Sequence, residues 1–143
     1  MENVKIYLSG AMAGISWEEQ TEWRQRVKRA IKSRYYANEK KIAFFDPTQF
    51  YNFKEKAHKS EKEIMEFDLY NLRNSDLVIV NFGNGGNKSI GTSMELMLAK
   101  ELRIPVIAFG HNEETHPWML ETCSRVCDDI DEVVSHVVDF YLN

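Results

Sequence analysis

The sequence predicts an α/β fold in which helices cover both faces of a mostly parallel sheet. An apolar run followed by a turn and a helical pattern opens the chain, and strand-like runs alternate with helical patterns along all 143 residues. Ser or Asp residues followed three positions later by Glu mark several helix starts. Because no internal repeat, low-complexity tract or linker interrupts this order, we expect one domain spanning residues 1–143.

The first strand and helix are the clearest elements. Residues 4–9 are apolar-rich and end at Gly10, which predicts a buried strand and a turn. Ser16 and Glu19 form a capping box for a helix that runs to about Arg34. The buried positions expected on this helix are Trp23, Val27, Ala30 and Ile31.

The next elements are a short strand and a second helix. The run KIAFFDP over residues 41–47 predicts a strand that ends at its proline, and residues 48–62 carry no firm period, which favours a loop with short helical turns. A second capping box begins a helix over residues 60–74. Its expected buried stripe is Met65, Leu69 and Leu72.

The second half repeats the alternation. We expect a strand at 76–82, a Gly/Asn loop at 83–91, a helix at 92–102 and a strand at 104–109. A final helix is expected from Asp129, with Glu132 as capping partner and Val133, Val134, Val137 and Tyr141 as buried positions.

The bulk properties narrow the function classes. A formal net charge of −4 argues against a protein that coats nucleic-acid phosphates, because such binding requires excess Lys and Arg. No segment approaches the roughly 20 apolar residues of a membrane span, and the first residues do not resemble a secretion signal. We therefore expect a cytoplasmic protein without nucleic-acid or membrane partners.

The two cysteines do not form a disulfide framework. Cys123 and Cys127 have the spacing that places two thiols on one helix face, and we expect them to be reduced. A zinc site that adds His111 and His116 is conceivable, but the spacing matches no established ligand pattern. We expect no metal and no cofactor.

Ligands of open parallel sheets bind beyond the carboxyl ends of the strands, so the loops after strands carry the candidate site. In YLSGAMAG, Tyr7 lies late in the first strand, and small residues follow that would let a ligand approach the backbone. A tight turn is the alternative explanation for the glycines. The candidate binding residues of this loop are Ser9, Gly10, Ala11 and Met12.

The segment SIGTSMEL combines a helix N-terminus with a carboxylate. Ser89 and Gly91 come just before the helix, and Glu95 falls in its first or second turn. The positive end of the helix favours an ionised carboxylate and a nearby phosphate. We therefore consider Glu95 a candidate nucleophile; the alternative is that it only complements the helix dipole.

Asp68 lies at the edge of the buried stripe of its helix, an unusual place for a carboxylate. It can serve a buried donor, or it can converge with Glu95 into the pair of carboxyls that glycosidic cleavage uses. Desolvation and like charge would then raise one of the two pKa values, giving an acid beside an ionised nucleophile. After the fourth strand, His116 and Trp118 can cover a base or reach a neighbouring subunit, although ordinary packing is the alternative.

The landmarks KIYLSGAM, FDP, EIMEFDLYNLRNSDLVIVNF, SIGTSMELMLAK and RIPVIAF, in this order, resemble the nucleoside 2-deoxyribosyltransferase family. The resemblance implies a flavodoxin-like, Rossmann-like three-layer sandwich with a mostly parallel five-stranded sheet. It also implies a covalent deoxyribosyl intermediate on Glu95, Asp68 at the nucleobase, Tyr7 orienting the nucleophile, and a homo-oligomer (dimer or higher) with active sites near subunit contacts.

One departure bears on the substrate. The transferases usually carry aspartate six residues before the nucleophile, whereas this chain has Ser89, as do the family's deoxynucleoside monophosphate hydrolases. A hydroxyl beside a helix N-terminus can donate to a 5'-phosphate that a carboxylate would repel. Against this, the first-loop arginine of those hydrolases corresponds to Ala13 here.

The expected function is cleavage of the N-glycosidic bond of a 2'-deoxynucleoside or its 5'-monophosphate, completed by water or by a free nucleobase. Two alternatives stay open. One is a lysine decarboxylase-like phosphoribohydrolase with PGGxGTxxE, whose spacing is broken here because four residues separate Gly86 from Gly91 where that motif has one. The other is a non-catalytic nucleotide-sensing module. A P-loop and a GxGxxG motif are both excluded by the sequence.

Overall fold

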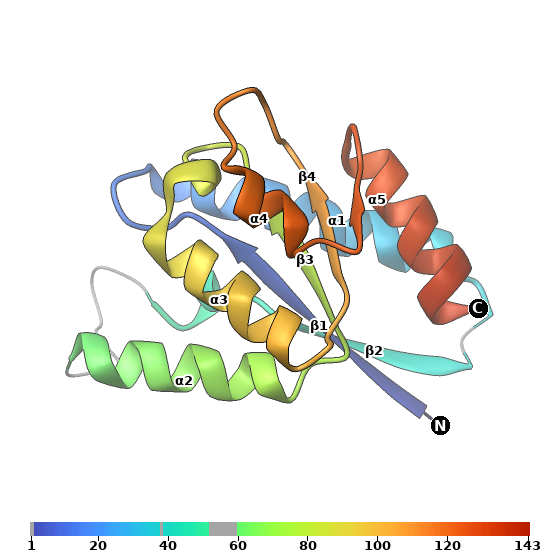
Figure 1. The fold of residues 1–143 in the computed structure, drawn as a ribbon. Helices are drawn as coiled ribbons and strands as arrows, with labels where there is room; N and C mark the ends of the chain where they lie inside the picture. Colours follow the sequence, from blue (N-terminus) through green and yellow to red (C-terminus); the bar gives the residue numbers. More distant parts are fainter. Residues whose placement is uncertain (1, 38, 52–59) are drawn as a thin grey trace.

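The computed structural model describes residues 2–37, 39–51 and 60–143, which form a three-layer α/β sandwich around a five-stranded parallel sheet (Figure 1). The strand order is β2-β1-β3-β4-β5, the flavodoxin-like order, so the predicted fold class is confirmed. The strands are β1 (Glu2–Gly10), β2 (Lys40–Phe45), β3 (Leu77–Asn81), β4 (Val106–Phe109) and β5 (Arg125–Val126). The helices are α1 (Trp17–Arg34), η1 (Pro47–Gln49), α2 (Glu61–Arg73), η2 (Gly86–Lys88), α3 (Ile90–Glu101), α4 (Pro117–Glu121), α5 (Ile130–Val137) and η3 (Val138–Leu142).

The two faces of the sheet have separate cores. Alternate residues of a strand point to opposite faces. Ile6 and Leu8 of β1 therefore join the core under α1 and α5, whereas Tyr7 joins the core under α2, α3 and α4. Figure 1 shows α2 and α3 side by side over one face and α1 behind the sheet. Consequently, a ligand group that contacts Tyr7 belongs to the α2/α3 face.

The predicted helix starts are confirmed in atomic detail. Ser16 Oγ accepts a hydrogen bond from the Glu19 amide at 3.1 Å, and Ser60 Oγ accepts one from the Glu63 amide at 3.2 Å. Asp129 Oδ1 accepts from the Glu132 amide at 2.8 Å. Each cap satisfies an amide that the helix itself leaves without a partner.

Two local predictions were wrong, and a third held in part. Met65 is 46% exposed, and Leu72 with the half-buried Leu69 packs α2 against the sheet. Tyr141, in the π-helical turn η3, is half-buried and packs against the core under α1 and α5. Cys123 and Cys127 do not share a helix face: β5 lies between them, and they contact the cores on opposite faces of the sheet.

Part of the loop predicted at 48–62 lies outside the described residues; its described start contains the short turn η1, as expected. The short elements α4 and β5 had no counterpart in the prediction. Within the described ranges, no helix has both the length and the apolar character of a bilayer crossing.

Candidate functional site

Glu95 reaches the carboxyl end of β1 from α3. Ser89 caps this helix, its Oγ accepting a hydrogen bond from the Thr92 amide at 3.2 Å. Long side chains on a helix point back toward its N-terminus. The Glu95 carboxyl accordingly meets β1, where Ser9 Oγ lies 3.5 Å from Oε1. The second oxygen, Oε2, is buried and has no hydrogen-bond partner among the described residues.

Tyr7 places a phenol on the same side of the sheet as Ser9. Its ring is fully buried and stacks on Phe45 with ring centroids 5.0 Å apart, while its hydroxyl lacks a hydrogen-bond partner among the described residues. Burial, together with the negative charges of Glu95 and Asp68, raises the pKa of Tyr7 well above its ordinary value. Tyr7 is therefore a neutral phenol whose hydrogen is free to be donated.

Asp68 approaches from α2 and is held by a residue that the sequence prediction missed. The Tyr51 hydroxyl, which follows η1, donates to Asp68 Oδ1 at 2.6 Å. Burial and this hydrogen bond raise the pKa of Tyr51, so the phenol remains a donor. The aromatic stretch after FDP was a signal for Tyr51, but its lack of periodicity concealed which ring would turn toward α2.

Electrostatic interactions couple the ionisation of Glu95 to that of Asp68 and Tyr7. Burial raises the pKa of Glu95 to about 8, and the charge of Asp68 acts in the same direction. Tyr7, the Arg24 charge and Ser9 lower this pKa but do not outweigh burial. The expectation of an ionised Glu95 was thus wrong for the free protein at neutral pH. Glu95 lies in the second turn of α3, and the helix dipole weakens beyond the first.

Desolvation and the like charge of Asp68, the two causes expected for a pair of neighbouring carboxyls, raise the pKa of Glu95. A carboxyl poised near neutral pH can exchange its proton during a reaction. Tyr7, Ser9, Asp68 and Glu95 therefore combine a carboxyl of shifted pKa with two hydroxyls and a second acid at one edge of the sheet.

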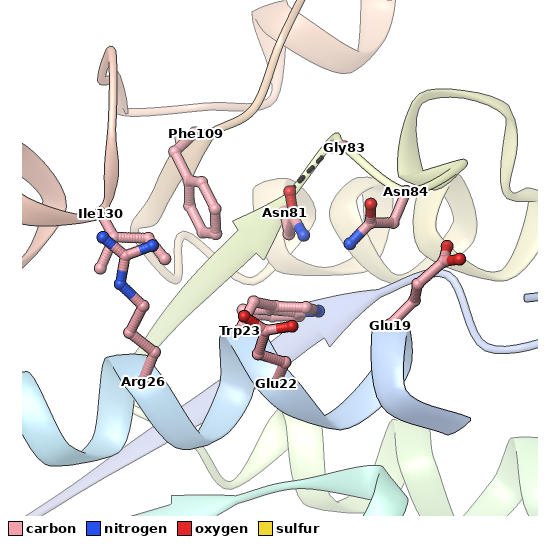
Figure 2. A pocket seen from close by; sticks show the side chains of 9 residues that line it. All are labelled: Glu19, Glu22, Trp23, Arg26, Asn81, Gly83, Asn84, Phe109 and Ile130. Atoms are coloured by element: carbon pink, nitrogen blue, oxygen red, sulfur yellow. Dashed lines mark hydrogen bonds between the residues drawn. The ribbon is translucent and has the colours of Figure 1, made fainter. Parts of the chain in front are cut away.

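A cavity of about 330 Å³ opens on the opposite face of the sheet and does not include this cluster. Figure 2 shows the Trp23 ring beneath it, with the Asn81 side chain above accepting a hydrogen bond from the Gly83 amide at 2.8 Å. Its polar lining comes mostly from exposed side chains of α1. The lining residues are Glu19, Glu22, Trp23, Arg26, Asn81, Gly83, Asn84, Phe109 and Ile130.

Comparison with known proteins decides the family. The family model described as "Nucleoside 2-deoxyribosyltransferase like" matches residues 3–112, most of the chain. The chain belongs to this family. The resemblance predicted from the sequence landmarks is confirmed, and it supports an enzyme of the nucleoside deoxyribosyltransferase or N-glycosidase type. No match is found among curated proteins.

Solved structures share the fold of this deoxyribosyltransferase-like protein. A 2-deoxyribosyltransferase from Bacillus psychrosaccharolyticus aligns with a TM-score of 0.69 at 18% identity, covering 92% of this chain and 90% of that one. A deoxyribosyltransferase from Leishmania mexicana aligns with a TM-score of 0.61 at 13% identity, covering 96% and 99%. A CMP N-glycosidase from Clostridium botulinum gives a TM-score of 0.55 at 14% identity, covering 96% of this chain and 99% of that one. At these identities the likeness supports the fold.

The first loop of the deoxyribosyltransferase-like domain contributes differently from what was predicted. Ser9 is buried at the Glu95 carboxyl, as proposed for a binding residue. Gly10 has another reason to be glycine: a Cβ there would lie 2.8 Å from Trp23 Cζ2, so helix packing on the opposite face requires it. Ala11 is buried and Met12 is half-buried.

Two residues with side-chain hydroxyls, Ser89 and Thr92, lie at the N-terminus of α3, close to Glu95 in the sequence. Ser89 Oγ accepts from the Thr92 amide, which leaves its own hydrogen free for another acceptor. Thr92 Oγ1 is buried without a hydrogen-bond partner among the described residues. Gly91, between them, is exposed. Sequence analysis missed Thr92 because a threonine in the first turn of a helix carries no signal of its own.

His116 and Trp118 are not brought to the cluster within one chain. His116 Nδ1 accepts from the Trp118 amide at 3.1 Å and caps α4, and Trp118 is 80% exposed. Among the described residues, neither side chain has a hydrogen bond or ring contact with Tyr7 or Glu95. In the described residues, no group of three or more His, Cys, Asp or Glu side chains is arranged to hold a metal ion.

Proposed function

We propose that this protein cleaves the N-glycosidic bond of 2'-deoxynucleosides or their 5'-monophosphates through a covalent deoxyribosyl intermediate on Glu95. The observation that carries the proposal concerns two buried polar atoms at the carboxyl edge of the sheet, Glu95 Oε2 and the Tyr7 hydroxyl. They influence each other's ionisation, but among the described residues neither has a hydrogen-bond partner. Buried polar groups are normally hydrogen-bonded, so two unpartnered ones at one place suit a polar ligand. A sugar, with its hydroxyls and ring oxygen, supplies such partners.

In the first half-reaction, Glu95 Oε2 attacks C1' and the bond from C1' to the base nitrogen breaks, its electron pair leaving with the base. The proton that Glu95 carries in the free protein must leave before the attack. Asp68 is the proposed acceptor, and it passes this proton to the departing base. Tyr51, bound to Asp68 Oδ1, fixes that carboxyl in place.

In the second half-reaction, water or a second nucleobase attacks C1' while Asp68 accepts the proton that the attacking group loses. The ester bond breaks, Glu95 leaves as a carboxylate, and it regains its proton from Asp68. Water gives an N-glycoside hydrolase and a base gives a deoxyribosyltransferase. The outcome depends on how completely the bound base excludes water from C1'.

Ser89 favours a substrate with a 5'-phosphate. Its oxygen already accepts the Thr92 amide, so the hydroxyl hydrogen can point toward a phosphate at the N-terminus of α3. Aspartate at this position would place a negative charge there instead. We therefore propose the 5'-monophosphate as the preferred substrate. The exposed Ala13 cannot contribute a positive charge to this phosphate.

We also propose a homo-oligomer in which α3 and α4 contribute to the subunit contact. Ile90 of α3 is 77% exposed, Met94 and Met97 are also exposed, and Trp118 extends the same apolar character onto the neighbouring α4. Exposed apolar surface of this kind marks association sites. Sedimentation equilibrium should show a species heavier than 16.7 kDa, and Trp118→Asp should shift it toward the monomer.

The test of function is direct. The purified protein is mixed with each deoxynucleoside and deoxynucleoside monophosphate, with and without a second base, and products are separated chromatographically. Free base without acceptor identifies a hydrolase, whereas exchange that requires an acceptor identifies a transferase. Binding without any turnover would support the nucleotide-sensing alternative and contradict the proposal.

Glu95→Ala is the matching variant. It should abolish turnover while leaving substrate binding largely intact, because the carboxyl is assigned to bond formation and not to affinity. Glu101→Ala, at an exposed position of the same helix, is its control. An active Glu95→Ala protein would refute the assigned role.

A further inference from the structure

Arg24 on α1 is a fully buried arginine that binds the end of β1 from the face opposite Glu95. Its Nη2 donates to the Gly10 carbonyl at 3.2 Å and its Nε to the Leu8 carbonyl at 3.4 Å. A third bond, from Nη1 to the Gln20 carbonyl at 2.6 Å, anchors the guanidinium to its own helix. The two strand carbonyls belong to the residues on either side of Ser9.

These carbonyls are the ones that the sheet leaves unpaired. The Lys5 carbonyl accepts from the Asp76 amide on the β3 side. Since carbonyls alternate sides along a strand, those of Leu8 and Gly10 point toward β2. The ladder between β1 and β2 ends at Tyr7 and Phe45, whereas β1 continues beside β3 as far as Gly10. Arg24 therefore supplies the donors that β2 no longer provides.

The charge around Arg24 is also unbalanced. Arg24 Nε lies 3.8 Å from Asp46 Oδ1, and Lys28 Nζ lies 2.7 Å from Asp46 Oδ2, with all three side chains buried or nearly so. Asp46 further accepts a hydrogen bond from the Thr48 amide. Among the described residues, the ion pairs of this cluster thus join two cations to one anion. A buried cation favours an anion nearby.

The groups that act on Glu95 come from three elements. Tyr7 and Ser9 face it from β1, Asp68 from α2 and the Arg24 charge from α1. Of these, Arg24 is the cation. It thus has a geometric link to Glu95 through Ser9 and an electrostatic link across the strand.

We propose that Arg24 is a positioning residue for Glu95: by binding the two carbonyls around Ser9 it fixes the end of β1 against the Glu95 carboxyl. Its positive charge supports this role, because it favours the ionised carboxylate. The proposal rests on the proposed function for its catalytic consequence. The positioning itself can be measured without turnover.

The test uses two substitutions that separate geometry from charge. Arg24→Gln keeps hydrogen-bond donors and removes the charge, while Arg24→Lys keeps the charge and loses the planar fork that reaches two carbonyls. Arg29→Gln, at an exposed position of α1, is the matched control. Circular dichroism establishes that each variant is folded.

The first readout is the titration of the Glu95 carboxyl by carbon-13 NMR, assigned with Glu95→Gln. Arg24→Gln should move this titration to higher pH, and Arg29→Gln should leave it in place. An unmoved titration in folded Arg24→Gln would overturn the electrostatic part of the proposal whether or not the protein turns over substrate.

The second readout is the position of the strand end. In Arg24→Lys, amide hydrogen exchange at residues 9–11 should accelerate on the order of 10-fold, and kcat should fall by a similar factor or more with a smaller change in KM. Wild-type exchange in folded Arg24→Lys would overturn the positioning role. Absence of turnover in the wild-type protein would contradict the proposed function and leave the Glu95 titration and the amide hydrogen exchange to decide the role of Arg24.

Discussion

Ser9 and Glu95 meet at the carboxyl edge of the sheet, with Ser9 Oγ 3.5 Å from Glu95 Oε1, although 86 positions separate them in the sequence. Tyr7, two residues before Ser9, faces the same side of β1. One strand thus presents two hydroxyls toward one buried carboxyl on α3. The protonation of that carboxyl is the property on which the following predictions depend.

Tyr7→Phe should shift the alkaline limb of the kcat/KM profile to higher pH. In the wild-type protein this limb is expected near pH 8, where Glu95 loses the proton that Asp68 is proposed to relay to the base. Tyr7 favours the ionised carboxylate, so its loss raises the pKa of Glu95 further, by about one pH unit. Tyr70→Phe, on the exposed side of α2, is the control. A limb that stays near pH 8 in Tyr7→Phe would disprove the proposed coupling.

Asp68→Asn should move the titration of Glu95 in the opposite direction. The charge of Asp68 raises the pKa of Glu95, so removing it lets Glu95 ionise at lower pH. The asparagine oxygen can still accept the Tyr51 hydrogen bond, which keeps the local structure. Maximal kcat should nevertheless fall on the order of 100-fold, because the proposed proton donor is lost. Full kcat in Asp68→Asn would remove Asp68 from the mechanism.

Glu95→Gln should make the protein more stable at neutral and mildly alkaline pH. The folded-state pKa of about 8 lies above the ordinary value of 4.5, so the folded state holds a proton that the unfolded chain releases. The wild-type free energy of unfolding therefore falls as pH rises from about 4.5 to about 8, with a slope up to about 1.4 kcal/mol per pH unit.

Urea unfolding of wild type and Glu95→Gln at pH 5, 6, 7 and 8 measures this difference. The advantage of Glu95→Gln should grow across the series, while Glu101→Gln on the same helix should show no such growth. A constant difference between wild type and Glu95→Gln would mean that the carboxyl is not desolvated as the structure indicates.

Ser89→Asp tests the phosphate preference without loss of the helix cap, since aspartate caps a helix about as well as serine. The added charge should lower kcat/KM for 5'-monophosphates on the order of 10-fold relative to the corresponding nucleosides. Ser89→Ala should instead destabilise the fold by about 1 kcal/mol through loss of the Thr92 contact. If Ser89→Asp leaves the substrate ratio unchanged, the phosphate does not lie at the start of α3.

The features that could be predicted from the sequence are those that depend on neighbouring residues along the chain. Strand and helix order, the serine and aspartate caps, and the placement of Glu95 after a strand follow from apolar periodicity and capping chemistry alone. The partner of Asp68 could not be predicted in this way, because Tyr51 belongs to a stretch without periodicity and its contact depends on the packing of η1 against α2.

Buried charges were the second feature that could not be predicted from the sequence. Arg24 and Lys28 lie on the buried side of α1, where helical periodicity predicts apolar residues. The position of Arg24 is explained by the tertiary structure, because the β1–β2 ladder ends at Phe45 and leaves strand carbonyls for it to bind. The protonation of Glu95 was mispredicted for a related reason. The helix terminus is visible in sequence, whereas the burial that outweighs it depends on tertiary contacts.

The most direct test of the central claim is mass spectrometry of enzyme quenched during turnover of a 2'-deoxynucleoside 5'-monophosphate. If Glu95 is the nucleophile, a deoxyribosyl adduct will be found on the peptide that contains Glu95, localised to this residue and absent from Glu95→Gln. Turnover with the adduct on another side chain, or with no adduct under conditions that trap glycosyl esters, would contradict the claim.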